Sequence, residues 1–359
     1  MTGHLTHNPT LGRDIRAGDW AALAEGTAPL IHRCLSQGDS KGAAELAQFF
    51  LGEMQVVFDI YTQWFADTAR YLRDKAVPQA QIDGAHQDIR RRLAPFHASA
   101  QEPRAGVWAQ IAADIALVAD EVLPPSARHQ ALDRAVGTWR DLHDCEVDQL
   151  SGLFDLVIRR FGEPALRQMY EGWVIGDWFA KRYQRFDVSN LDWSSASRML
   201  VYLAFEGHHG HLSGAARDGS IEFAEDAEKI TLSFSPCGSG GRTLAGEPRD
   251  ALPPIADERL DWPPLGGAHD FTWNQTGICA YCAHCCLLHE TLPIAAFGYP
   301  VRVTDPPRAP LTGESRCHWT VYKDLRAIPD QIYRRTGARK PAAHLPLGSA
   351  GRAAREAQP

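Results

Sequence analysis

The sequence predicts an α+β fold, in which an N-terminal all-helical bundle is followed by a smaller, loop-rich α+β domain with a Cys-rich metal site. The observations behind it are the helical spacing of apolar residues up to about residue 206, the polar–apolar alternation of short segments after residue 207, and the gathering of most cysteines in this second part. We expect a flexible N-terminus over 1–13, a helical bundle domain over 14–206, a Cys-rich α+β metal-binding domain over 207–337 and a disordered tail over 338–359.

The helical part contains one long amphipathic helix. Between Ser40 and Lys75 the apolar residues recur at three- and four-residue spacing, Ser40 can cap the start, and Pro78 ends the segment. The aromatic residues from Phe49 to Tyr71 are expected to lie in the core rather than to hold a cofactor. Further helices are predicted over 79–94, 105–122, 126–149, 150–162, 164–184 and 194–206.

The second part contains short strands and few helices. "SIEFAED" and "KITLSFS" alternate polar and apolar residues, which predicts a hairpin of two half-buried strands. Two more strands are expected in "YPVRVTD" and "CHWTVYK", and a short helix in "DLRAIPDQIYRRTG". The stretch from Cys237 to about Gly267 is too rich in glycine and proline for long elements.

Composition limits the class of protein. With 359 residues, 44% hydrophobic and 23% charged, the chain is typical of a soluble globular protein, and its net charge of −7 gives no reason to expect nucleic acid or an anionic membrane as a partner. The N-terminus lacks a signal-peptide core, and the apolar runs are too short to span a membrane. We therefore expect a cytoplasmic protein with reduced thiols, and a homo-oligomer is compatible with the sequence.

The densest chemical signal is the run "GICAYCAHCCLLHE". Cys279, Cys282 and Cys285 form a CxxCxxC pattern, in which short turns bring sulfur atoms toward one ion. We predict zinc, with Cys317 as the fourth ligand; the other candidates for that position are Cys237, His284, Cys286 and His289. The same spacing is half of an iron–sulfur pattern, so a [4Fe-4S] cluster is the alternative. The pattern leaves open whether the metal is structural or catalytic.

A glycine-rich loop follows the second predicted strand, in "KITLSFSPCGSGGRT". Its backbone N–H groups can form an anion-binding nest, so we expect Gly240, Gly241 and Arg242 to bind an acidic group of a substrate. Cys237 is expected to act as a nucleophile or as a metal ligand.

A histidine run, "FEGHHGHLSG", joins the two predicted domains. We expect Glu206 with His209 or His211 to transfer protons there, because interdomain clefts often hold ligand pockets. Gly207 and Gly210 argue against a regular helix through this run. The acidic residues and His143 in "TWRDLHDCEVDQL" are expected on a solvated helix face, not in a metal site of the bundle.

These observations predict a metal-dependent cytosolic enzyme of hydrolase or lyase type. Its substrate is expected to be a small anionic organic molecule bound at the junction of the two domains. The alternatives are a ligand- or partner-binding protein whose zinc is purely structural, and an iron–sulfur redox protein. Nucleotide-dependent and serine-hydrolase chemistry lack support, because no glycine-rich phosphate loop and no GxSxG motif is present.

Overall fold

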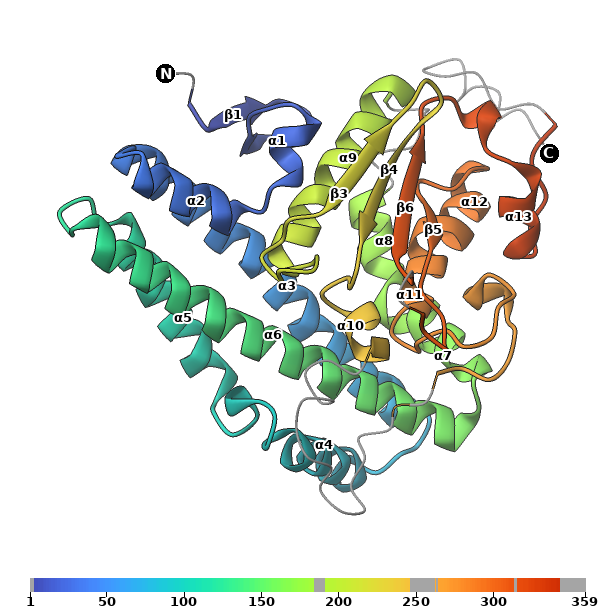
Figure 1. The fold of residues 1–359 in the computed structure, drawn as a ribbon. Helices are drawn as coiled ribbons and strands as arrows, with labels where there is room; N and C mark the ends of the chain where they lie inside the picture. The colour runs from blue at the N-terminus through green and yellow to red at the C-terminus, as the bar shows by residue number, and fades with distance from the viewer. Residues whose placement is uncertain (1–2, 184–190, 246–261, 263, 313–314, 343–359) are drawn as a thin grey trace.

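The structure, a computed structural model, describes residues 3–183, 191–245, 262, 264–312 and 315–342. These residues are mostly helical and form two small antiparallel sheets, so the predicted α+β class is confirmed (Figure 1). The metal site that completes the prediction is not tested by this architecture. Residues 343–359, which make up most of the expected tail, lie outside the described residues.

Three long helices, α3, α5 and α6, form the frame of the N-terminal half, and two shorter ones pack against them (Figure 1). Their bounds are α2 Thr27–Ser36, α3 Ser40–Asp74, α4 Gln79–Leu93, α5 Arg104–Ala119 and α6 Pro125–Phe161. The long helix predicted from residue 40 is confirmed as α3. Its cap is Asp39 rather than Ser40, because the Asp39 side chain accepts a hydrogen bond from the backbone N–H of Gly42.

Two of the predicted helix boundaries are wrong. The helices predicted over 126–149 and 150–162 are the single helix α6, since no proline interrupts it after its first residue. The helix predicted over 164–184 is instead divided into α7, a π-helical turn and α8, with bounds Pro164–Met169, Tyr170–Val174 and Gly176–Tyr183. A Cβ at Gly176 would lie 2.5 Å from the carbonyl oxygen of Glu171, so glycine is required at this break.

The segment expected to be flexible at the N-terminus forms a hairpin. Strand β1 (Leu5–Asn8) pairs antiparallel with β2 (Arg13–Arg16), and α1 (Trp20–Ala24) follows. Arg16 is buried and donates hydrogen bonds of 2.8 Å to the carbonyl oxygens of Ala22 and Glu25. The hairpin is thus tied to the rest of the chain by side chains, which composition alone does not reveal.

Helix α9 (Trp193–Gly210) continues past its predicted end at residue 206. Gly207 does not end it, contrary to the sequence prediction, and Gly210 is its last residue. A Cβ at Gly210 would lie 2.6 Å from the carbonyl oxygen of Glu53 on α3, so glycine lets the two helices approach closely. The extra turn places His208 and His209 on a regular helix against α3.

A four-stranded antiparallel sheet lies beside α9 (Figure 1). Its strand order is β3-β4-β6-β5, and the bounds are β3 Glu222–Glu225, β4 Lys229–Phe234, β5 Val303–Asp305 and β6 Cys317–Tyr322. All four predicted strands are therefore confirmed. The other short helical elements are α10 Gly240–Ala245, α11 Ala283–Cys286, a π-helical turn Leu287–Thr291, α12 Leu292–Phe297 and α13 Asp330–Arg335.

One continuous hydrophobic core runs through both predicted domains. It extends from Ile15 in the hairpin to Tyr333 on α13 and includes buried residues of α3, α6, α9 and the sheet. The two parts therefore pack on each other through apolar side chains. Their division into two domains stays a prediction.

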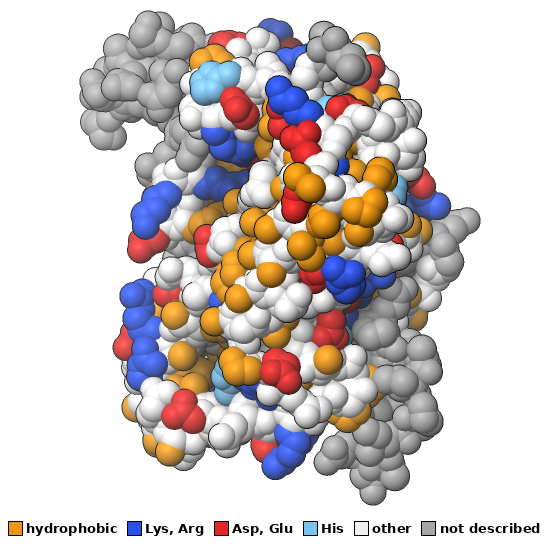
Figure 2. Space-filling view, turned by 90° about the vertical axis from the view of Figure 1, so that its left-hand side faces the viewer, with side chains coloured by type: hydrophobic (Ala, Val, Ile, Leu, Met, Phe, Trp, Pro, Cys, Tyr) orange, Lys and Arg blue, Asp and Glu red, His pale blue; other side chains and the backbone are white. Residues whose placement is uncertain are grey.

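The surface contains acidic and basic side chains side by side. On the face shown in Figure 2 they surround a band of hydrophobic atoms, without an extended basic area. Within the described residues, no helix combines the length and the apolar character needed to cross a membrane. That the chain binds no nucleic acid stays a prediction.

Candidate functional site

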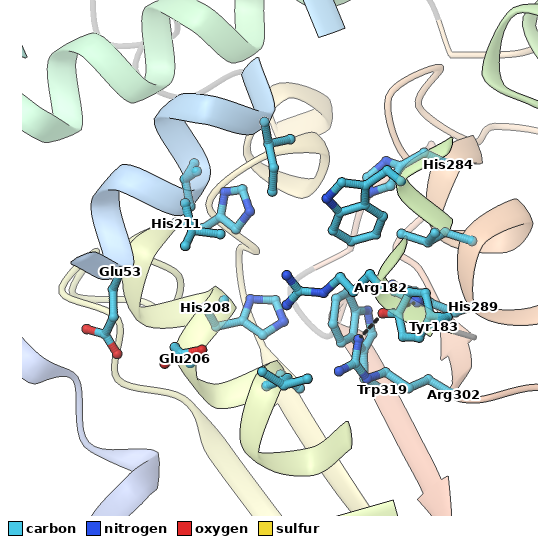
Figure 3. Close-up of a pocket in the computed structure, with 18 of the residues that line it drawn as sticks. Glu53, Arg182, Tyr183, Glu206, His208, His211, His284, His289, Arg302 and Trp319 are labelled. Carbon is cyan, nitrogen blue, oxygen red and sulfur yellow. Dashed lines mark hydrogen bonds between the residues drawn. The ribbon is translucent and has the colours of Figure 1, made fainter. Parts of the chain in front are cut away.

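A pocket lies where the helical part meets the Cys-rich part (Figure 3). Its lining comes from α3, α8, α9, the segment around α11, and β6. The cavity has a volume of about 100 Å³, which is below the roughly 300–1,000 Å³ of sites for drug-sized ligands, so it suits only a small molecule. The position agrees with the expectation of a pocket at this junction.

The walls of the pocket are largely apolar and aromatic. Trp64 and Ile60 of α3, Trp178 of α8, Leu203 of α9 and Leu288 contribute to them. The indole of Trp64 packs against the Tyr281 ring, with centroids 5.5 Å apart. Such walls favour a ligand with an apolar or ring-shaped body.

One end of the pocket gathers cationic groups and hydrogen-bond donors. Figure 3 shows Arg182, Arg302, His208 and His289 around the same space. Arg302 is buried, donates 2.8 Å from Nη1 to the Tyr183 hydroxyl, and stacks over the indole of Trp319 at 5.1 Å. Three buried nitrogen atoms here have no hydrogen-bond partner among the described residues: Arg182 Nε, Arg302 Nε and His208 Nε2.

Burial and like charge keep the histidines of the pocket neutral. Burial, followed by repulsion from Arg302, lowers the pKa of His208 to about 3. The pKa values of His211 and His289 are also held well below 6.5, first by burial and then by neighbouring cationic groups. A bound anion would offset the repulsion between these groups, so this end of the pocket favours a negatively charged ligand.

Two carboxylates lie at the other end of the pocket in Figure 3. Glu206 is paired with Arg13 of β2 at 2.7 Å. Glu53 Oε1 accepts from His209 Nδ1 at 2.9 Å, whereas its buried Oε2 has no partner. The pocket is therefore polar at both ends and apolar between them.

A chain of hydrogen bonds reaches the pocket from α6. The Asp144 carboxylate lies 2.8 Å from His143 Nδ1, and His143 Nε2 lies 3.0 Å from His211 Nδ1. The Tyr61 hydroxyl lies 3.1 Å from both of these histidine nitrogens. Asp144 assigns the proton of His143 to Nδ1, so His143 Nε2 accepts from His211 Nδ1–H. His211, which lines the pocket, then has the lone pair of Nε2 left for a ligand.

The predicted proton-transfer residues are only partly brought together. Glu206 and His211 both line the pocket, but His209 is buried and is held by Glu53 and by the carbonyl oxygen of Leu23 at 2.9 Å. The structure thus pairs Glu206 with Arg13 and His209 with Glu53, in place of the expected pairing of Glu206 with His209. His208, not His209, lines the pocket from α9.

The predicted substrate loop does not line this pocket; Cys237 and Gly241 line a separate one. Arg242 is fully buried and donates 2.6 Å to Asp148, with Asp144 at 3.4 Å. Its charge is therefore balanced within the chain. The backbone N–H of Gly241 donates 2.9 Å to the Cys237 sulfur, and a Cβ at Gly240 would lie 2.5 Å from the Cys282 sulfur. These glycines allow close approach to thiols, and the expected anion nest does not lie in the pocket.

The predicted metal ligands gather in one region beside the pocket. Cys279, Cys282 and Cys317 are buried, Cys237 and Cys285 are half-buried, and none of the chain's cysteines forms a disulfide. A hydrogen bond with Cys279, burial and the neighbouring thiols raise the pKa of Cys282. Burial also raises the pKa of Cys237, which disfavours the thiolate that the expected nucleophile or metal ligand needs.

The thiol cluster does not show a closed metal cage. Four thiolates on a tetrahedral zinc lie about 3.8 Å apart, given Zn–S bonds of roughly 2.3 Å. The one group of three potential ligand atoms within 4.8 Å of one another in the described part of the chain lies elsewhere, at His4, Cys34 and Asp39. Zinc or an iron–sulfur cluster at the thiols stays a prediction.

Several residues of the pocket and of the hydrogen-bond chain behind it were not predicted from the sequence. Arg182 and Arg302 lie in segments without any recognisable motif. His143 and Asp144 were expected on a solvated face but are buried. The burial of His143 could have been predicted, since His143 lies at helical spacing on the same face as the apolar residues Trp139, Leu142 and Leu150.

Arg242→Ala is expected to destabilise the fold by ~3–5 kcal/mol, because it leaves the buried carboxylates of Asp144 and Asp148 without their cation. The control is Arg316→Ala, which removes an exposed ion pair with Glu222 and should cost about 0–1 kcal/mol. Urea unfolding measures both variants. If both variants lose little stability and by the same amount, Arg242 does not stabilise the fold and is free to bind a ligand, as the sequence predicted.

Comparison of the chain with models of protein families, with curated proteins and with solved structures gave no match. A function can therefore be proposed only from the fold and the pocket.

Proposed function

We propose that the chain is a cytoplasmic enzyme that binds a small organic carboxylate in the pocket and transfers protons through His211. The ligand has an apolar or aromatic body that lies against Trp64 and Trp178, and its anionic group lies at Arg182 and Arg302. The reaction type that this site supports best is hydrolysis or elimination, since both need a positioned general base.

The observation that carries the proposal is the group of buried, unpartnered donors at one end of the pocket. Buried N–H groups without a partner are costly, each by about 1–3 kcal/mol. The guanidinium groups of Arg182 and Arg302 lie there with His208 and His289, and in Figure 3 the carboxylates of Glu53 and Glu206 lie on the side of His208 away from Arg302. A carboxylate ligand satisfies the donors and offsets the charge at once.

The hydrogen-bond chain from Asp144 supports the proton-transfer role. Asp144 orients His143, which in turn orients His211 and fixes its lone pair on Nε2. The low pKa of His211 makes it a weak base in the unliganded pocket, and a bound anion raises that pKa toward neutrality. The base thus becomes effective when the substrate is present.

The metal dependence is a further part of the proposal. Cys279, Cys282, Cys285 and Cys317 would hold zinc, with Cys237 alongside. Support comes from their gathering in one region and from the raised pKa of Cys282, which a hydrogen bond with Cys279, burial and the neighbouring thiols cause and which a divalent cation would lower. The same run contributes Tyr281 and His284 to the pocket wall, so a metal there stabilises the site.

Phenylacetate should bind to the purified chain, whereas the neutral phenylacetamide should not. Arg182→Gln should weaken phenylacetate binding by ~10–100-fold, because a charged hydrogen bond contributes about 1.5–3 kcal/mol. Arg316→Gln, which changes an exposed arginine outside the pocket lining, serves as the control. Calorimetry measures the affinities. Equal affinity for acid and amide, or an unchanged Arg182→Gln variant, contradicts an anion site.

His211→Gln should lower turnover by ~10²–10⁴-fold while phenylacetate affinity changes little, because the base is lost and the cationic end is kept. Turnover is measured on the first substrate found among small carboxylate-bearing esters, amides and hydroxy acids. The exposed His7→Gln is the matched control. Full activity of the His211→Gln variant would show that His211 is not the general base. Binding of carboxylates without turnover of any compound would favour a ligand-binding protein.

Cys279→Ser should lose the metal that the wild-type protein retains, and its C-terminal part should melt at a lower temperature, since binding energy is folding energy. Cys145→Ser, a buried cysteine in a separate small cluster, should keep the metal. Elemental analysis of protein purified without oxygen gives the result. Iron with labile sulfide would show an iron–sulfur cluster in place of zinc. Wild-type protein without metal would contradict both the zinc site and the cluster.

A further inference from the structure

Three different ligand types converge between the N-terminal hairpin and the first long helices. His4 precedes β1, Cys34 lies in the last turn of α2, and Asp39 caps α3. His4 Nε2 is 2.7 Å from Asp39 Oδ2 and 3.5 Å from the Cys34 sulfur. The three ligand atoms all lie within 4.8 Å of one another.

Each of the three side chains is held by its own backbone anchor. The carbonyl oxygen of His4 accepts from Ala17 N at 2.8 Å, which is a hydrogen bond beside the β1–β2 ladder. The backbone N–H of Asp39 donates to the carbonyl oxygen of Cys34 at 2.9 Å, which closes the end of α2. Gly42 N donates to Asp39 Oδ1 at 2.9 Å and leaves Oδ2 facing His4.

The space for this convergence depends on Gly42. A Cβ there would lie 2.3 Å from Asp39 Oδ2 and 2.6 Å from the His4 ring. Any other residue would push the carboxylate and the imidazole apart. The glycine therefore preserves the meeting of His4 and Asp39, although its own helix would be more stable with alanine.

The donor set matches zinc(II). Imidazole nitrogen, thiolate and carboxylate are its usual ligands, and one thiolate with one carboxylate balance its charge. Donor atoms around tetrahedral zinc lie roughly 3.3–3.8 Å apart, so Cys34 and His4 fit and the His4–Asp39 pair has to open by about half an ångström. The His4 and Asp39 side chains are 30% and 28% exposed, which leaves the fourth position to water.

We propose that His4, Cys34 and Asp39 bind a zinc ion that fastens the N-terminal hairpin to α2 and α3. This site is separate from the thiol cluster and does not depend on the proposed enzyme function. Its place in the fold gives it a consequence for the pocket. The hairpin carries Arg13, which pairs with Glu206 on the pocket wall, so the ion fixes the strand that holds this carboxylate.

The test is a cobalt(II) titration of the full-length protein, because cobalt replaces zinc at such sites and its bond to thiolate gives a near-ultraviolet absorption band. Removing a ligand should cost more than the ~10–100-fold loss typical of an outer-shell partner. We therefore expect Cys34→Ser to lose one thiolate band, and His4→Gln to bind cobalt at this site more than ~100-fold more weakly. Cys279→Ser should retain the band that Cys34→Ser loses, which separates this site from the thiol cluster.

Two further variants keep the test decisive if Cys34→Ser does not fold. His7→Gln changes an exposed histidine of the same hairpin and should behave like the wild type. Gly42→Ala should weaken cobalt binding without removing any ligand, since its methyl group occupies the space of the Asp39 carboxylate. Identical cobalt spectra and affinities in the wild type, His4→Gln and Gly42→Ala would overturn the proposal and leave an ordinary His–Asp ion pair beside a buried thiol.

Discussion

The buried carboxylate of Asp144 is the point on which the two halves of the structure depend. It lies 2.7 Å from Arg217, 2.8 Å from His143 and 3.4 Å from Arg242. Burial alone would raise the pKa of Asp144, but Arg242, His143 and Arg217 together hold it well below 3.8. Since Arg217 follows α9 and Arg242 lies on α10, one α6 side chain fastens two segments of the Cys-rich part to the bundle.

The same carboxylate determines the chemistry that the pocket can perform. Through His143 it fixes the orientation and tautomer of His211, whereas it has no direct contact with the pocket lining. A buried ion pair adds little net stability, but it gives a defined arrangement that a purely apolar contact would not. The buried Asp144 and His143 of α6 therefore position one imidazole, that of His211, at the pocket wall.

Sequence patterns predict local elements better than the site. The spacing of apolar residues in α3 and the alternation in β4 and β6 identify these elements, because each pattern follows from one face being buried. The pocket instead depends on contacts between distant segments, such as Arg302 with Tyr183 of α8. Arg242 shows the limit most clearly: beside three glycines it resembles an anion-binding residue, and its actual partner is a carboxylate ~100 positions earlier on a helix expected to face solvent.

The most direct test of the central claim, that the pocket takes up an anion, is a measurement of protons bound together with the ligand. The unliganded pocket holds His208 neutral at pH 7, with its pKa lowered to about 3 by burial and by Arg302. A carboxylate beside it favours the charged imidazole, so the complex binds more protons than the free protein, and affinity must rise as pH falls from roughly 7 to 5. Calorimetric titration of phenylacetate in buffers of different ionisation enthalpy should therefore show net proton uptake and tighter binding at the lower pH. Binding without proton uptake, or an affinity that falls with pH over this range, would contradict the account.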